Sequence, residues 1–124
     1  MLTYSQKKYL FAIYKLGQNG GRVKSTDIAG IAGVSKPSTA LMLQKLADMG
    51  YIIKEPYGKI TITDKGIKDA NDIYTKCVII KDFFSRTLGV SDECADEDAV
   101  AIVSHLNEDT AERFVEYILQ SDKL

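Results

Sequence analysis

The sequence predicts a mainly α-helical protein with a small β-hairpin, in which an N-terminal winged helix-turn-helix precedes a helical C-terminal half. Three observations support this fold class. Residues 25–50 have the pattern of a helix-turn-helix, residues 51–63 contain two β-branched segments around a turn, and residues 64–124 keep helical periodicity. The sequence contains no internal repeat and no low-complexity segment.

The first helix is expected between Tyr4 and Leu16. Thr3 and Gln6 have the spacing of a capping box, in which the two side chains satisfy N–H groups that the first turn leaves unpaired. Apolar and aromatic residues then recur at helical intervals until Gly17: Tyr9, Leu10, Ile13, Tyr14 and Leu16. Residues 18–21 are expected to form a loop, and residues 22–24 a short extended segment.

The helix-turn-helix begins with a short helix that opens on polar capping residues, Ser25, Thr26 and Asp27. This helix is expected to bury Ile28, Ala29 and Ile31, and the small side chain of Ala29 allows a partner helix to approach closely. Gly33 is expected to make the turn. The predicted order of helix, turn and helix is typical of DNA-binding proteins.

The second helix of the motif is capped by Ser35, carries Pro37 in its first turn and ends at Gly50. Its inward face is expected to contain Leu41, Leu43, Leu46 and Met49. The opposite face carries Lys36, Ser38, Thr39, Gln44 and Lys45. Such a hydrogen-bonding front end is typical of a recognition helix whose N-terminal residues enter the major groove of DNA.

Two segments rich in β-branched residues, 51–54 and 59–63, predict a hairpin around the turn at residues 55–58. A hairpin that follows a helix-turn-helix is the wing of a winged-helix domain. Its tip, with Lys54, Tyr57 and Lys59, is expected to lie against the phosphate backbone.

The C-terminal half is expected to begin with a long linking helix at residues 64–88, followed by Gly89. Residues 91–98 are acidic, and the apolar segment 99–103 is too hydrophobic for the surface of a monomer, which predicts a subunit interface. A final amphipathic helix is expected to start at a capping box formed by Asp109 and Glu112. Its apolar positions are Ala111, Phe114, Val115, Ile118 and Leu119.

Composition and charge limit the possible functions. The net charge of −1 conceals an asymmetry, because residues 1–63 carry a net charge of +6 and residues 64–124 a net charge of −7. A basic first half suits a contact with nucleic acid. The sequence has no run of about 18 apolar residues and no basic-then-apolar start, so we expect a soluble cytoplasmic protein without a membrane partner.

Several segments together are typical of one family. They are Tyr9 with Ile13-Tyr14, residues 23–29, residues 34–46, Ile62-Thr63-Asp64-Lys65-Gly66, residues 83–90 and His105-Leu106. With them, essentially the whole chain resembles the metal-dependent repressors of the diphtheria-toxin repressor and manganese-transport regulator family, and its length matches the short manganese-type members. The resemblance implies a winged-helix DNA-binding domain at residues 1–63 and a helical dimerisation domain at residues 64–124. It also implies a homodimer that binds a palindromic operator of double-stranded DNA.

The regulatory metal of this family is manganese or Fe(II), and the resemblance places its ligands at six positions. These positions are occupied by Lys8, Phe11, Cys77, Val100, Val103 and Ser104. Five of the six cannot supply the oxygen or nitrogen ligands that these metals favour, and the thiol of Cys77 is softer than they prefer. We therefore expect no metal at the family site and no other cofactor. Two interpretations of Lys8 remain open: a solvated lysine, or an ammonium that occupies the space of the missing cation.

The expected DNA-binding residues follow from the resemblance and from their places on the predicted elements. Lysines are expected on phosphates, at Lys36, Lys45, Lys54 and Lys59. Polar side chains are expected on base edges, at Ser38, Thr39 and Gln44. The remaining contacts are expected from Ser25, Thr26, Pro37 and Tyr57. The expected dimer interface consists of Val78, Val100, Ile102, Val103 and Leu106.

Two alternatives to a metal-independent DNA-binding regulator remain open. One is a metal-responsive repressor with a displaced site, for which Cys77, Cys94, His105 and the acids at residues 96–98 are the candidate ligands. The same cysteines would also be the candidates for a redox switch. The other alternative is a winged helix that binds a protein. An enzyme is not expected, because the chain has one histidine, no nucleophile and base paired in the sequence and no glycine-rich cofactor loop.

Overall fold

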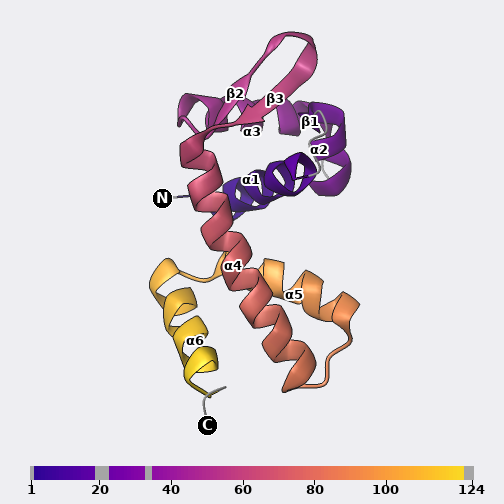
Figure 1. Cartoon of the computed structure of the whole chain (residues 1–124). Helices are drawn as coiled ribbons and strands as arrows, with labels where there is room; N and C mark the ends of the chain where they lie inside the picture. The colour runs from indigo at the N-terminus through magenta and orange to yellow at the C-terminus, as the bar shows by residue number, and fades with distance from the viewer. Residues whose placement is uncertain (1, 19–22, 33–34, 122–124) are drawn as a thin grey trace. The chain divides into compact units, whose positions relative to one another are not determined.

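The computed structural model describes residues 2–18, 23–32 and 35–121 (Figure 1). The elements are α1 (Tyr4–Gly17), β1 (Val23–Lys24), α2 (Ser25–Ala32), α3 (Lys36–Asp48), β2 (Ile52–Lys54), the 3-10 turn η1 (Pro56–Gly58), β3 (Lys59–Ile62), α4 (Asp64–Arg86), α5 (Asp92–His105) and α6 (Glu108–Ser121). The chain divides into two compact units, Met1–Asn71 and Asp72–Leu124, and the border falls within α4. The predicted fold class, a winged helix-turn-helix followed by helices, is confirmed.

The first helix, α1, begins at the predicted capping box. The Thr3 N–H donates to Gln6 Oε1 at 3.0 Å, and the Gln6 N–H donates to Thr3 Oγ1 at 3.2 Å. Further along, α1 contributes to the core of the first unit, which also receives side chains from α2, α3, α4 and all three strands. The core includes Tyr9, Leu10, Ile13, Val23, Ile28, Leu43, Leu46, Tyr51, Ile52, Ile60 and Ala70. Burial of these side chains is the main source of stability for the unit.

The recognition helix, α3, starts and ends as predicted. The Ser35 hydroxyl accepts a hydrogen bond from the Ser38 N–H at 3.3 Å, Pro37 lies in the first turn, and Gly50 follows the helix with φ +84°. Gly33, predicted to make the turn before α3, lies outside the described residues.

The predicted inward face of α3 is wrong at two positions. Leu41 is 70% exposed, whereas Thr39 is buried with 1% exposure, beside Leu43 and Leu46 on the inner face. Each helical residue turns the direction of the side chain by about 100°, so Leu41 points almost opposite to Thr39 and Leu43. The apolar character of Leu41 suggested burial, but its angular position decides its exposure.

The wing is part of a three-stranded antiparallel sheet with strand order β1-β3-β2. The predicted hairpin is formed by β2 and β3, in which Ile52 pairs with Ile62 and Lys54 with Ile60. The short segment β1 joins the other edge of β3 through the pair of Val23 with Ile60. The extended conformation of β1 was predicted, but its pairing across more than thirty residues was not.

The start of α4 is tied closely to the end of the hairpin. The Thr63 hydroxyl lies 2.7 Å from the Gly50 carbonyl oxygen and 3.0 Å from that of Tyr51, and it accepts a hydrogen bond from the Gly66 N–H at 3.1 Å. A Cβ atom on Gly66 would overlap the Tyr51 carbonyl oxygen and would lie 2.7 Å from Ile62 Cγ1. The Thr-x-x-Gly segment is therefore a close-packed joint between β3 and α4.

Tyr51 strengthens this joint through its side chain. The Lys65 ammonium lies 4.4 Å from the centre of the Tyr51 ring, and it also donates to the Met49 carbonyl oxygen at 2.9 Å. Burial of the phenol, together with its hydrogen bond to the Asp69 carboxylate, raises the pKa of Tyr51 above its ordinary value. The phenol is therefore neutral at physiological pH and can donate to Asp69.

In the second unit, α5 and α6 both contact α4 (Figure 1). The rings of Phe83 on α4 and Phe114 on α6 meet edge to face, with centroids 5.8 Å apart. On the α5 side, Lys81 Nζ lies 3.8 Å from an oxygen of Asp96. Both shorter helices of this unit therefore contact α4.

One face of α5 is buried within the chain, while other residues of the apolar segment 99–103 keep accessible surface. Ala95, Ala99 and Val103 are spaced four residues apart and are almost completely buried. The prediction that Val103 contacts a partner subunit is wrong, because the side chain is only 2% exposed within one chain. Val100 and Ile102 are half-buried and keep some accessible surface.

The start of α6 also differs from the prediction. The helix begins at Glu108, so Asp109 lies in its first turn and does not cap it. The Arg113 Nε–H donates to Asp109 Oδ2 at 3.0 Å, an i, i+4 pair on the helix surface. The predicted capping box at Asp109 and Glu112 is therefore wrong, because each carboxylate has a basic partner elsewhere.

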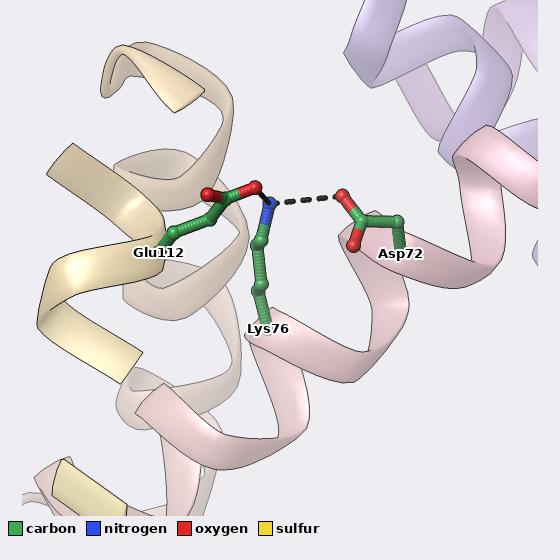
Figure 2. Close-up of polar contacts among 3 residues, drawn as sticks. All are labelled: Asp72, Lys76 and Glu112. Carbon is green, nitrogen blue, oxygen red and sulfur yellow. Dashed lines mark hydrogen bonds and ion pairs between the residues drawn. The ribbon is translucent and has the colours of Figure 1, made fainter. Parts of the chain in front are cut away.

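Glu112 on α6 is paired with Lys76 on α4, whose side chain is only 10% exposed (Figure 2). Lys76 Nζ lies 2.8 Å from Asp72 Oδ2 and 3.9 Å from Glu112 Oε1. A buried ammonium is costly unless carboxylates compensate its charge, and here two of them do. The Lys76 cluster, consisting of Asp72, Lys76 and Glu112, therefore joins α4 to α6.

In the part of the chain that the structure describes, no helix is both long enough and apolar enough to cross a membrane.

We predict that Gly66→Ala lowers the free energy of unfolding by about 2 kcal/mol, because the methyl group would overlap the Tyr51 backbone in a packed region. Chemical denaturation of the full chain measures the effect. Gly30→Ala in α2 is the matched control, since its Cβ would meet no atom within 4 Å, and it should be neutral or slightly stabilising. Equal stability of the two variants would contradict the proposed joint.

We predict that Lys76→Glu lowers the free energy of unfolding by about 3 kcal/mol, because it places a third carboxylate between Asp72 and Glu112 in a poorly hydrated position. Lys76→Met should cost less than about 1 kcal/mol, since the apolar stem is retained. The control is Lys81→Glu on the same helix, whose side chain is 41% exposed and should tolerate the reversal better. A loss from Lys81→Glu as large as that from Lys76→Glu would contradict the role of burial.

Candidate nucleic-acid interface

The exposed face of α3 carries most of the polar residues that were predicted to contact DNA. Lys36, Pro37, Ser38, Gln44 and Lys45 are all exposed. The Ser35 hydroxyl satisfies the Ser38 N–H, and the side chains of Lys36, Pro37 and Ser38 in this first turn are exposed. A helix with this exposed front end can enter the major groove and place polar atoms on base edges and phosphates.

The hydroxyl groups at the start of α3 are engaged with one another. The Ser35 hydroxyl lies 3.0 Å from the Ser38 hydroxyl, while the Thr39 hydroxyl donates to the Ser35 carbonyl oxygen at 3.0 Å. The prediction that Thr39 reads a base edge is wrong, because its side chain is buried and bonded to its own helix. Thr39 instead holds the first turn in place, and Ser38 remains exposed.

Gln44 connects the recognition helix to the wing. Its side-chain amide donates to Asp48 Oδ1 at 3.0 Å, and its oxygen accepts a hydrogen bond from Lys54 Nζ at 3.4 Å. Lys54 lies on β2, ten residues further along the chain. The hairpin thus brings a wing lysine next to the recognition helix. The Gln44 amide is already hydrogen-bonded on both sides.

The tip of the wing presents one aromatic side chain and one lysine. Tyr57 is 98% exposed and has φ +65°, a left-handed conformation that is uncommon outside glycine and asparagine. Lys59 Nζ lies 3.4 Å from Glu55 Oε2, and both side chains remain partly exposed. The Lys59 ammonium therefore contacts both the Glu55 carboxylate and solvent. The Tyr57 side chain is surrounded almost entirely by solvent.

Two predicted contacts lie at the start of α2. Thr26 is exposed, and the side chain of Ser25 lies outside the part of the chain that is described. Leu41, which the sequence analysis placed on the inward face of α3, is exposed among the predicted contact residues. The helical angle relative to Leu43 and Leu46 would have indicated its exposure, since a residue two positions before one of them points away from the core.

The six positions that the resemblance assigns to metal ligands do not fit manganese or iron. On α1, Lys8 is exposed and Phe11 is buried. On α4, Cys77 is a buried thiol outside any disulfide, and on α5 the Ser104 hydroxyl donates to the carbonyl oxygen of Val100 at 2.7 Å. An ammonium, a phenyl ring, aliphatic groups and a hydroxyl bonded to its own helix offer no carboxylate or imidazole.

The candidate ligands of a displaced site are also scattered. Among residues 2–18, 23–32 and 35–121, no three His, Cys, Asp or Glu side chains come close enough together to hold a metal ion. Cys94 is exposed at the start of α5, and Asp96 is paired with Lys81. His105 lies at the last position of the same helix.

Two family models match this chain. The model described as "Iron dependent repressor, N-terminal DNA binding domain" matches residues 1–60. The model described as "Iron dependent repressor, metal binding and dimerisation domain" matches residues 63–123. The two matches together leave only a few residues outside.

Curated relatives are transcriptional regulators. An uncharacterized HTH-type transcriptional regulator of Methanocaldococcus jannaschii is 33% identical over 110 residues, which are 89% of this chain and 85% of the relative. The regulator MntR of Bacillus subtilis is 30% identical over 125 residues, which are 98% of this chain and 87% of MntR. MntR of Salmonella typhimurium is 33% identical over 100 residues, and the match covers 81% of this chain and 63% of that protein.

Solved structures of similar fold include regulators that respond to metals. The structure described as the manganese regulator SloR has a TM-score of 0.76 at 24% identity, and the match covers 93% of this chain and 53% of SloR. ScaR with bound Zn²⁺ has a TM-score of 0.73 at 28% identity, with the same coverage. The chain therefore spans about half the length of these solved regulators. With both family models matched, the chain belongs to the iron-dependent repressor family of metal-dependent, DNA-binding transcriptional regulators.

Proposed function

We propose that the protein is a homodimeric, sequence-specific transcriptional regulator that binds operator DNA without control by metal at its family's site. One observation carries the DNA-binding part of this proposal. Lys36, Ser38 and Lys45 are exposed on α3, and Lys54 of the wing is hydrogen-bonded to the same helix. This arrangement supports a single surface on which α3 occupies the major groove and the wing follows the backbone.

In this proposal, lysines supply most of the affinity and few side chains read bases. Lys36, Lys45, Lys54 and Lys59 neutralise phosphates, and Tyr57 contacts the backbone from the tip of the wing. Ser38 contacts a base edge, and two further exposed residues, Thr26 at the start of α2 and Pro37 in the first turn of α3, contact the backbone. Gln44 positions Lys54 through its amide oxygen and keeps one amide N–H that can reach a base edge.

The dimer is proposed to form through the second unit. Val78 on α4 is 48% exposed, and half-buried apolar residues on or next to α5 remain accessible: Val100, Ile102 and Leu106. An exposed valine and partly exposed aliphatic groups fit a subunit interface better than a solvated surface. A two-fold symmetric dimer would present two copies of α3, which favours a palindromic operator.

The proposed independence from metal rests on the chemistry of the side chains. Lys8, Phe11, Val100, Val103 and Ser104 cannot act as the carboxylate and imidazole ligands that the family requires, and Cys77 alone cannot hold an ion. A positive charge on Lys8 would also repel a cation. The signal that controls this regulator would then be something other than manganese or iron at that site.

We expect selection of genomic fragments on the purified protein to enrich the same palindromic site with a strong chelator and with added manganese. Sequencing of the retained fragments is the readout. Enrichment only with manganese would contradict metal independence and would favour a displaced site that includes Cys77, Cys94 or His105. Absence of enrichment in both arms at low salt would contradict DNA binding and favour a protein-interaction module.

We also predict that Lys36→Ala weakens binding of the enriched fragment and lowers the slope of log K against log salt by about 0.9, which corresponds to one phosphate contact. Fluorescence anisotropy at several salt concentrations measures both quantities. Lys68→Ala is the matched control, because Lys68 is an exposed lysine on α4 of the same unit. If the two variants change the slope equally, Lys36 has no specific role in phosphate binding.

A further inference from the structure

Leu41 is an exposed leucine in the middle of the polar face of α3. It is 70% exposed, whereas the leucines on the opposite side of the same helix, Leu43 and Leu46, are buried. Residues three and four positions away lie on the same helical face. These neighbours are Pro37, Ser38, Gln44 and Lys45, all of them exposed. Leu41 is therefore surrounded by residues of the proposed DNA-binding surface.

We infer that Leu41 is a specificity-determining residue that contacts the 5-methyl groups of thymines in the major groove. This inference rests on the proposed function, in which α3 enters that groove. The thymine methyl group is the only apolar group that a base pair presents in the major groove. A leucine has neither donor nor acceptor, so a methyl group is the feature of a base edge that it can recognise favourably.

The polar neighbours of Leu41 offer limited hydrogen bonding to bases. The Gln44 amide is held by Asp48 on one side and by Lys54 on the other. The Ser38 hydroxyl lies 3.0 Å from the Ser35 hydroxyl. Gln44 keeps one amide N–H and one oxygen lone pair, but a bidentate pairing with adenine would have to share the amide with Asp48 and Lys54. Apolar contact through Leu41 would then add direct base readout beside Ser38 in the middle of α3.

The backbone around Leu41 is well fixed, which a methyl contact requires. Leu43 and Leu46 anchor the inner face of α3 in the core, and the Thr39 hydroxyl bonds the Ser35 carbonyl oxygen. Apolar contact depends on close approach over a small area, so a fixed helix gives discrimination that a mobile loop would not. Removal of one buried methyl group is expected to weaken binding about fourfold.

The test uses duplexes of the fragment enriched in the selection experiment, in which each thymine is replaced in turn by 2′-deoxyuridine. This replacement removes the methyl group and leaves base pairing unchanged. Wild-type protein is expected to lose about fourfold in affinity at one or two positions in each half-site. Leu41→Ala should bind the unmodified fragment more weakly and should show no further loss at those same positions. Leu41→Met, which keeps an apolar side chain of similar reach, should retain the sensitivity.

Leu88→Ala is the matched control, because Leu88 is an exposed leucine that follows α4 in the second unit. It should keep the wild-type response to deoxyuridine at every position. The inference is overturned, while DNA binding stands, if wild-type protein is insensitive at all positions or if Leu41→Ala remains as sensitive as wild type. If no fragment binds at all, the proposed function and this inference are both overturned.

Discussion

The winged-helix unit depends on the close contact between Gly66 and the backbone of Tyr51. Residue 66 has no side chain, so the first turn of α4 can lie directly against the segment that leads into β2. The Thr63 hydroxyl lies within hydrogen-bonding distance of two carbonyl oxygens in the same place and accepts the Gly66 N–H. This joint fixes where the hairpin ends and where the helix begins, and the position of the wing follows from it.

The wing, in turn, is held by partners that are distant in sequence. On one edge β3 pairs with β1, and on the other it pairs with β2, whose Lys54 reaches Gln44 on the recognition helix. A hydrogen bond between side chains therefore links the sheet to the recognition helix. Such coupling supports a recognition surface that is largely formed before DNA arrives.

The features that could be predicted from the sequence were local, and those that could not depended on packing. The capping box at Thr3, the Ser35 cap and the β-branched strands act over three or four residues and were confirmed. Thr39 and Leu41 were placed on the wrong faces because polarity was given more weight than angular position. Val103 was assigned to a surface because its segment is apolar, yet neighbouring helices bury it. In the candidate site, the exposed lysines followed from sequence, but the engagement of Gln44 required tertiary contacts.

The hydrogen bond between Lys54 and Gln44 has a consequence for the entropy of association. A solvated lysine has many rotamers, and confining it costs up to about 2 kcal/mol. Lys54 already has a partner near the helix, so part of this cost is met during folding. When a phosphate approaches α3, the Lys54 ammonium would need to move only a short distance, from the Gln44 side-chain oxygen to a phosphate oxygen. Encounter with DNA would then need less conformational search than it would with a wing of freely rotating lysines.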